Sequence, residues 1–211
     1  MMAGIMQMSV DSEVWRRRLR SAMRFRRDAG GMAAIEFAMI LPLLVLMFFG
    51  MIDISMGVGT DRKVTMVTQT MADLTSRYAS VTETDFTNFF AIADAMITPY
   101  DKVPLKTTIS QIYIDPAAKT GKVQWSRGEA TLTAGSPIGV PADLIVKDAS
   151  GAVSSNQYLI LSQTSYLYQP IIGWVVPKAG ITLTESTYTR PRQSTCIPIS
   201  PGTTCTTKLT P

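Results

Sequence analysis

The chain has 211 residues, of which 46% are hydrophobic and 17% are charged, so it has room for one medium-sized domain and an anchor. Its net charge of +4 arises entirely before Gly31, where there are seven arginines and three acidic residues. The rest of the chain has no net charge. That neutrality excludes a basic face for nucleic acid, and the absence of histidine excludes Ser-His-Asp catalysis, Cys-His catalysis and the commonest zinc sites.

The arginine-rich residues 1–31 precede a long apolar segment. No charged residue occurs from Phe37 to Ile52, and with Met32–Glu36 the apolar helix reaches roughly 21 residues, enough to cross about 30 Å of hydrocarbon. Because the arginines lie on one side only, the N-terminus is expected to be cytoplasmic and the C-terminal body to lie outside. We therefore predict a cytoplasmic leader over 1–31 and a transmembrane helix over 32–56.

The helix is expected to continue through residues 57–80 as an amphipathic segment. Apolar residues recur there at spacings of three and four, which marks one helix face. These residues are Val64, Val67, Met71, Leu74 and Tyr78. This continuation argues against removal of the apolar segment as an ordinary secretory signal. Pro42, inside the apolar part, predicts a local kink.

Glu36 places a carboxylate near the start of this segment. A carboxylate in hydrocarbon is costly and usually has a partner. One explanation is a position at the cytoplasmic interface, among lipid headgroups beside the arginines.

A second explanation comes from a resemblance. The stretch "GMAAIEFAMILPLLVLMFFGMIDIS" resembles the N-terminal segment of TadE-like pseudopilins, which belong to the Tad (Flp, tight-adherence) branch of type IV pili. The family pattern is a glycine, four small or apolar residues, a glutamate with an aromatic residue after it, and an apolar helix with a proline. Gly31, Glu36, Phe37 and Pro42 match it. A weaker likeness continues in "LSQTSYLYQPIIG" and "ITLTESTYTRPR".

The resemblance implies processing by a dedicated prepilin peptidase. The cut would fall between Gly31 and Met32; Gly30 competes as the cut site, but the glutamate would then be the sixth mature residue rather than the fifth. The resemblance also suggests that Glu36 pairs with the new amine on Met32 of a neighbouring subunit, which would set the register between helices. In the alternative, Glu36 serves only peptidase recognition or the membrane interface.

Residues 81–192 are expected to form an extracytoplasmic head. A short helix is predicted over 84–96, with Thr82 or Thr84 as its N-cap. Strands are predicted around 109–114 and 121–126, which pair as a hairpin, and over 157–168 and 181–190. Residues 128–156 are glycine- and proline-rich and are expected to form an irregular connection. The predicted class is α+β, with a roughly four-stranded antiparallel sheet packed on the long helix, as in pilins.

The C-terminal residues 193–211 contain both cysteines, Cys196 and Cys205. If this segment lies outside the cytoplasm, a local disulfide is favoured, and it would stabilise the fold by roughly 2–3 kcal/mol. Two buried free thiols are the alternative.

No combination of residues points to catalysis, to a metal or to a cofactor, so the protein is not predicted to be an enzyme. Asp53, Asp61 and Asp73 are too far apart along one helix to act as a catalytic pair, and they are expected on a solvated or subunit-facing helix surface. Serine and threonine are abundant but lack an activating base of the usual kind.

Four aromatic residues of the head permit two interpretations. Trp125, Trp174, Tyr166 and Tyr168 either pack in the core beneath the strands or form an adhesive surface patch. Packing in the core is the more frequent role of such residues.

Taken with the resemblance, these features predict a minor pseudopilin that contributes to pilus biogenesis and surface adherence. The expected location is the inner membrane, with a periplasmic head and incorporation into an extracellular pilus. The expected partners are the prepilin peptidase, other pilins and pseudopilins, the inner-membrane assembly platform and the lipid bilayer. The alternative is an uncleaved single-pass protein whose periplasmic head is a scaffold of the assembly machinery.

Overall fold

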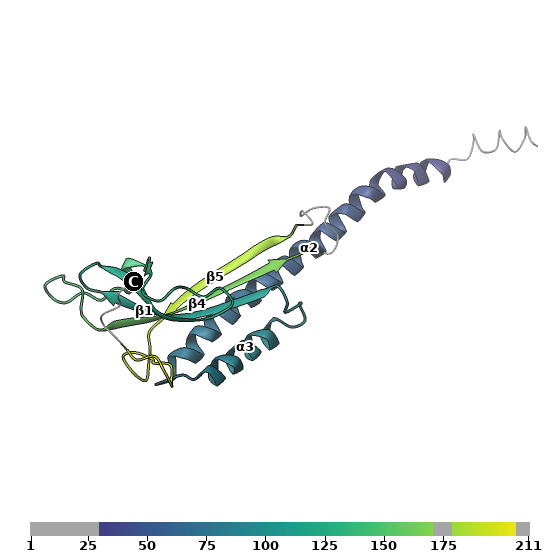
Figure 1. Cartoon of the computed structure of the whole chain (residues 1–211). Helices are drawn as coiled ribbons and strands as arrows, with labels where there is room; N and C mark the ends of the chain where they lie inside the picture. Colours follow the sequence, from purple (N-terminus) through teal and green to yellow (C-terminus); the bar gives the residue numbers. More distant parts are fainter. Residues whose placement is uncertain (1–29, 171–178, 206–211) are drawn as a thin grey trace, which may run out of the picture. The chain divides into compact units, whose positions relative to one another are not determined.

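The structure, a computed structural model, describes residues 30–170 and 179–205. Two helices, α2 (Gly30–Ser76) and α3 (Glu83–Ile97), come before an antiparallel sheet (Figure 1). The strands are β1 (Leu105–Asp115), β2 (Thr120–Gly128), β3 (Pro137–Ile138), β4 (Gln157–Tyr168) and β5 (Ile181–Thr189), and a short 3-10 helix η1 occupies Ala142–Leu144. The predicted α+β class, with helices first and a sheet after them, is confirmed.

The chain divides between Met51 and Ile52 into two compact units, and α2 contributes to both. In the first unit, α2 is the one described element, and nearly all of its side chains are exposed. Among the described residues, α2 is the helix with the length and apolar composition needed to cross a membrane. Pro42 lies inside it, and the kink expected there stays a prediction.

In the second unit, α2 presents the predicted apolar face to the head. Val64, Val67 and Met71 are completely buried, whereas Tyr78 lies beyond the end of the helix and is exposed. Threonines share this face. The hydroxyls of Thr68 and Thr75 each donate to the carbonyl oxygen four residues earlier, at 2.8 Å, so the helix itself satisfies these buried polar groups.

The N-terminus of α3 is held by a capping box. The Thr82 hydroxyl accepts a hydrogen bond from the Asp85 backbone N–H, and the Asp85 carboxylate accepts one from the Thr82 backbone N–H at 2.8 Å. Of the two predicted caps, Thr82 is therefore the one used. The buried face of α3 follows the helical spacing and consists of Phe86, Phe89, Ala93 and Ile97.

The strands form one sheet in the order β3-β2-β1-β4-β5, and all neighbours are antiparallel. The four predicted strands are present, and β4 has the predicted limits of 157–168. The β1–β2 hairpin runs longer than predicted at both ends and has an irregularity in its register between Gln111 and Ile112. The fifth strand, β3, has two residues and pairs only with Gly121 and Lys122.

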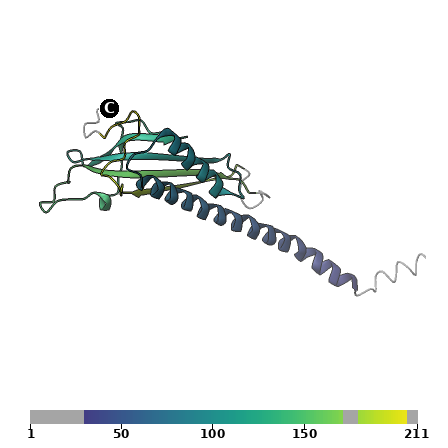
Figure 2. The ribbon, with the colours of Figure 1, turned by 90° about the horizontal axis from the view of Figure 1, so that it is seen from below.

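Both faces of the sheet are covered, by different parts of the chain. The second-unit part of α2 and the whole of α3 lie on one face (Figures 1 and 2), where their apolar side chains meet Ile109, Trp125 and Ile160. On the other face, Ile112 and Leu159 pack against the connection between β2 and β4. The stretch predicted to be irregular therefore closes a second hydrophobic core, and it also contains β3 and η1.

Candidate functional site

The predicted processing point lies in the first turn of α2, which begins at Gly30. A Cβ atom added at Gly31 would have no atom within 4 Å, apart from chain neighbours and the backbone of its own helix turn. The fold of this chain therefore does not require a glycine at position 31. The first backbone N–H groups of a helix have no partner within the helix, so an end turn is the part that can unwind most readily. A peptidase that needs an extended substrate would meet the least resistance here.

Glu36 and Met32 are separated by four residues, which places them on the same side of the helix. Both are exposed, as is Phe37. Within the described residues, the Glu36 carboxylate takes part in no hydrogen bond or ion pair. The side chain is thus available to a group outside the described part of this chain.

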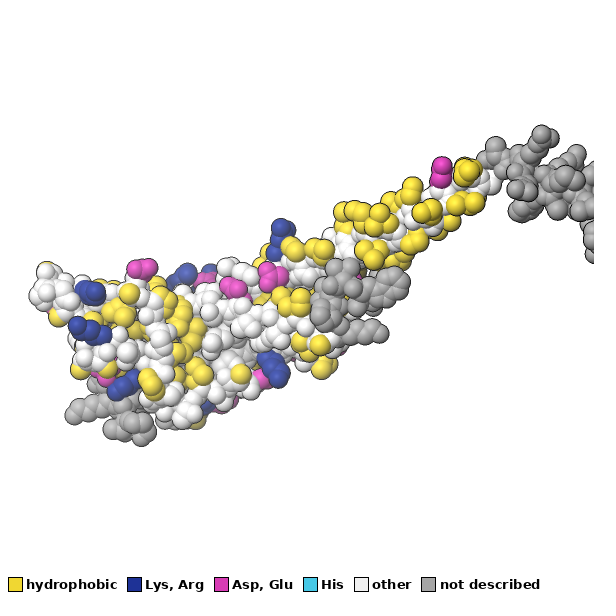
Figure 3. All heavy atoms as spheres, turned by 90° about the horizontal axis from the view of Figure 1, so that it is seen from above, with side chains coloured by type: hydrophobic (Ala, Val, Ile, Leu, Met, Phe, Trp, Pro, Cys, Tyr) yellow, Lys and Arg dark blue, Asp and Glu magenta, His cyan; other side chains and the backbone are white. Residues whose placement is uncertain are grey.

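Around Glu36 the helix surface is hydrophobic. Hydrophobic side chains cover the visible face of the N-terminal part of α2 (Figure 3). Met39, Leu43 and Met47 are examples, each with at least 60% of its surface exposed. A surface of this kind is unstable in water and suits contact with lipid tails or with other apolar helices.

Asp53 lies where α2 enters the second unit, and the structure corrects its predicted position. Only 1% of its surface is exposed, and Oδ1 has no hydrogen-bond partner in the described part of the chain. The prediction of a solvated surface is therefore wrong for Asp53, whereas Asp61 is exposed and Asp73 half-buried. Tyr168, from the far end of β4, covers this turn and donates a hydrogen bond from its hydroxyl to the Asp53 carbonyl oxygen at 2.9 Å.

Two tyrosines contact α2 at glycines, which the sequence alone did not indicate. A Cβ on Gly57 would lie 3.5 Å from the Tyr168 ring, and a Cβ on Gly59 would lie 2.8 Å from the Tyr100 hydroxyl oxygen. A side chain at position 59 would therefore displace Tyr100. Burial, with the Asp53 charge as a second cause, raises the pKa of Tyr168 above its usual range.

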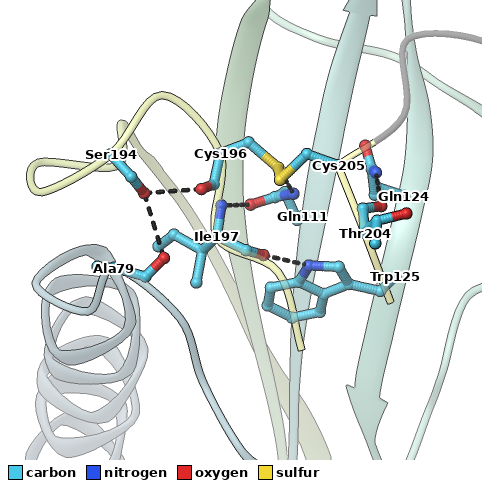
Figure 4. Close-up of a disulfide and its surroundings, with 9 residues drawn as sticks. All are labelled: Ala79, Gln111, Gln124, Trp125, Ser194, Cys196, Ile197, Thr204 and Cys205. Atoms are coloured by element: carbon cyan, nitrogen blue, oxygen red, sulfur yellow. Dashed lines mark hydrogen bonds between the residues drawn. A yellow bond between two sulfur atoms is a disulfide. The ribbon is translucent and has the colours of Figure 1, made fainter. Parts of the chain in front are cut away.

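Cys196 and Cys205 are joined by a disulfide, with their Cα atoms 6.1 Å apart (Figure 4). The buried side chain of Gln111, on β1, uses both ends of its amide here. Its Nε2 donates to Cys196 Sγ at 3.0 Å, and its Oε1 accepts from the Ile197 backbone N–H at 2.8 Å. Trp125 Nε1 donates to the Ile197 carbonyl oxygen at 2.8 Å. Side chains of the sheet thereby satisfy the backbone of the C-terminal segment.

The same segment also binds the turn between the two helices. The Val81 N–H donates to the Pro198 carbonyl oxygen at 3.0 Å, and the Ser200 N–H donates to the Val81 carbonyl oxygen at 2.8 Å. Close to these bonds, the Arg192 N–H donates to the Ser76 carbonyl oxygen at the end of α2. The segment thus ties α2 and α3 to the sheet.

The interpretation of the aromatic residues as core residues is confirmed for three of the four. Trp125, Tyr166 and Tyr168 are buried in the cluster between the helices and the sheet. Trp174 lies outside the described residues.

Two cavities lie among the described residues of the head. One, of about 360 Å³, lies between α3 and the strands β1 and β2, and Arg127 pairs there with Glu83 at 2.8 Å. The other, of about 430 Å³, lies where α2 enters the head. The described residues contain no group of three acidic, cysteine or histidine side chains placed to hold a metal ion.

Comparison with known proteins gives one match. The model of the TadE-like protein family matches residues 31–73, which confirms the resemblance over this segment. The match begins at Gly31 and ends inside α2, so α3 and the sheet lie outside it. No curated protein and no solved structure matches the chain. The family is one of structural pilus components rather than of enzymes.

Proposed function

We propose that this chain, whose residues 31–73 match the TadE-like protein family, is a minor pseudopilin that takes part in assembly of a Tad-type pilus. The observation that carries the proposal is the exposed apolar helix of residues 30–51, on which Glu36 stands four residues after Met32 and has no partner among the described residues. A prepilin peptidase removes residues 1–31. Met32 then bears a free amine, one helical turn from Glu36.

In this proposal, Glu36 of one chain pairs with the Met32 amine of a neighbouring chain. Helices that lie side by side in the low dielectric of a membrane or pilus interior each bring one buried amine and one buried carboxylate. Leaving either unpaired costs several kcal/mol, so the register that pairs them is favoured over the others. Other pilins and pseudopilins are the partners that supply such helices, and the inner-membrane platform brings them together.

The test is Glu36→Gln, which removes the charge and keeps the size of the side chain. Because Glu36 is exposed and unpaired in the described chain, the melting temperature of the head should not change. Leader removal should continue, and the amount of this chain in sheared pili should fall at least tenfold. Asp61→Asn is the matched control, since Asp61 is an exposed acid on the same helix. Normal incorporation of Glu36→Gln would exclude the pairing.

Gly31→Leu tests the cut. The space around Gly31 is open, so the variant should fold normally and accumulate with its leader attached. Gly30→Leu should be cut to give a chain that starts at Met32. If Gly30→Leu blocks the cut and Gly31→Leu does not, the cut lies one residue earlier.

One observation favours the second candidate, an uncleaved membrane protein whose periplasmic head is a scaffold of the assembly machinery. Helix α2 begins at Gly30, so it runs through the Gly31–Met32 peptide bond. A helix that includes this bond resists proteolysis until its first turn unwinds. The scaffold role predicts a full-length chain in membranes and none in sheared pili.

A further inference from the structure

At one end of the head, the start of β1, the end of β4 and the start of β5 lie close to the point where α2 joins the head. The register places the start of β1 beside the end of β4, with Leu105 opposite Tyr166. It places the end of β4 beside the start of β5, with Tyr168 opposite Ile181. Tyr168 also bonds to Asp53, in the first turn of α2 inside the second unit. Since Ile52 follows Met51 directly in the chain, this is the end of the head that is attached to the apolar segment.

Exposed hydrophobic side chains gather at this end. In the described part of the second unit, ten large hydrophobic side chains are exposed, and six of them lie here. We call these six residues the rim: Ile54, Met56, Val58, Val103, Leu167 and Ile181. Val103 is 79% exposed, more than any other large hydrophobic residue of the described head. Exposure of this kind, concentrated at one end, marks a contact surface.

The cavity of about 430 Å³ opens within the rim. Its walls contain Met56, Val103 and Leu167, together with Tyr100, Tyr166 and Tyr168. Tyr100 is half-buried, whereas Tyr166 and Tyr168 belong to the buried core. Lys106 is exposed near Val103, and its ammonium group suits anionic headgroups. Lys102 is also exposed and lies 4.0 Å from the Asp94 carboxylate, and Asp101 lines the cavity. The rim, with Lys106 beside it, therefore combines exposed apolar side chains with a cation, as a lipid–water boundary favours.

We propose that the rim lies among the lipid headgroups of the leaflet that faces the protein's head domain. Val103 and Leu167 insert between the lipids. The partner is a lipid surface, because the rim adjoins the start of a membrane-grade helix. This contact holds the head against the membrane before the subunit is incorporated into a pilus. This inference rests on the membrane anchoring in the proposed function.

The test places a fluorescent label in the rim of the full chain. Both native cysteines form a disulfide, so a cysteine introduced as Val103→Cys is the one that reacts. The labelled chain is reconstituted in vesicles of phosphatidylcholine and phosphatidylglycerol that contain lipids with a quencher near the headgroup. Leu167→Cys gives a second rim position, and both sites are exposed enough to accept the change.

Val146→Cys is the matched control. Val146 is 41% exposed, and its N–H donates to Gln157 Oε1 at 2.8 Å; Gln157 begins β4, at the opposite end of that strand from Leu167. The labels at 103 and 167 should be quenched at least threefold more strongly than the label at 146. Equal quenching at all three positions, in chains that float with the vesicles, would overturn the inference and leave the anchoring intact.

Two further outcomes would also contradict it. If the rim labels are shielded from water but not quenched by lipid, and Val103→Cys chains cross-link to each other, the rim is a contact between copies. If the chain does not float with the vesicles, the membrane anchoring itself fails, and the proposed function fails with it.

Discussion

Gln111 shows how single side chains hold the C-terminal segment in place. It is completely buried, yet its amide is satisfied by Cys196 and by the backbone of Ile197. An unsatisfied buried amide costs roughly 1–3 kcal/mol, so docking of the segment and burial of Gln111 depend on each other. The disulfide closes the loop that presents these partners (Figure 4).

We therefore expect Cys196→Ser to destabilise the head without affecting leader removal. Loss of the cross-link raises the entropy of the unfolded chain, and the free energy of unfolding should fall by about 2–3 kcal/mol. Denaturant titration of the full chain in detergent measures this change. Cys205→Ser should have nearly the same effect because both variants open the same loop. An unchanged transition midpoint in both variants would mean that the disulfide contributes no stability.

Buried tyrosines make the head sensitive to alkaline pH. Burial raises the pKa of Tyr113, Tyr158, Tyr166, Tyr168 and Tyr188 above the usual value of about 10. The folded state therefore keeps protons that the unfolded state releases. This contribution to stability is fully present below pH 10 and is lost as the pH rises through the raised values.

Thermal unfolding from pH 8 to 11, followed together with tyrosinate absorbance, checks this expectation. The melting temperature should fall above about pH 10, and tyrosinate should appear as the head unfolds. Tyr158→Phe removes one of these groups and keeps the ring that packs on Tyr113, at 5.2 Å between centroids, so its melting temperature should fall less steeply. Full tyrosine ionisation near pH 10 in a folded head would contradict the account.

At the scale of elements, Lys63 links the two helices. Its ammonium group donates to the carbonyl oxygens of Met96, at 3.1 Å, and of Thr98, at the C-terminal end of α3. A cation at this end of a helix satisfies free carbonyl groups and interacts favourably with the helix dipole. Lys63 on α2 thereby fixes the end of α3, just before the chain enters β1.

Lys63→Met should loosen the last turn of α3. The side chain keeps its length but loses its charge and its donors, at a cost of about 0.5–2 kcal/mol. Hydrogen exchange of the amides at 95–98 should speed up by roughly twofold to thirtyfold, since 1.4 kcal/mol corresponds to tenfold. Arg62→Met is the control, because Arg62 is exposed and has no such contact in the described chain. Equal exchange in the two variants would show that Lys63 does not hold α3.

The elements that the sequence predicted are those with a regular pattern. The spacing of Val64, Val67 and Met71 predicts a buried helix face, and the β-branched and aromatic run of β4 predicts a strand, because these patterns follow directly from helix and strand geometry. The two residues of β3 were not predicted, since a strand this short is defined only by its pairing with β2. The packing of the 129–156 connection was not predicted either, because its hydrophobic side chains are buried only by contact with strand residues of the sheet.

In the candidate site, too, features that depend on local sequence were predicted, and features that depend on distant contacts were missed. The glycine-to-glutamate spacing in α2 is local, so the resemblance could single out Gly31 and Glu36 from the sequence, and their roles stay predictions. Asp53 was wrongly expected on a solvated or subunit-facing surface, because its contact with Tyr168, 115 residues later in the chain, cannot be derived from the local pattern. Lys63 and the two glycines at the tyrosine contacts were missed for the same reason, since their partners lie far away in sequence.

At the scale of the whole molecule, the two units are expected to have different roles. The first unit, described here from Gly30 to Met51, is an exposed apolar helix that is suited to a membrane or to a bundle of similar helices. The second unit buries its own cores and binds its own C-terminal segment. In the proposed function, removal of the leader changes the first unit only, so assembly requires no refolding of the head.

The most direct test of this account is the intact mass of the protein purified from its own membranes, with and without the prepilin peptidase. The account predicts a chain that begins at Met32 when the peptidase is present and a full-length chain when it is absent. A full-length chain in both cases would contradict the pseudopilin proposal and favour the uncleaved scaffold.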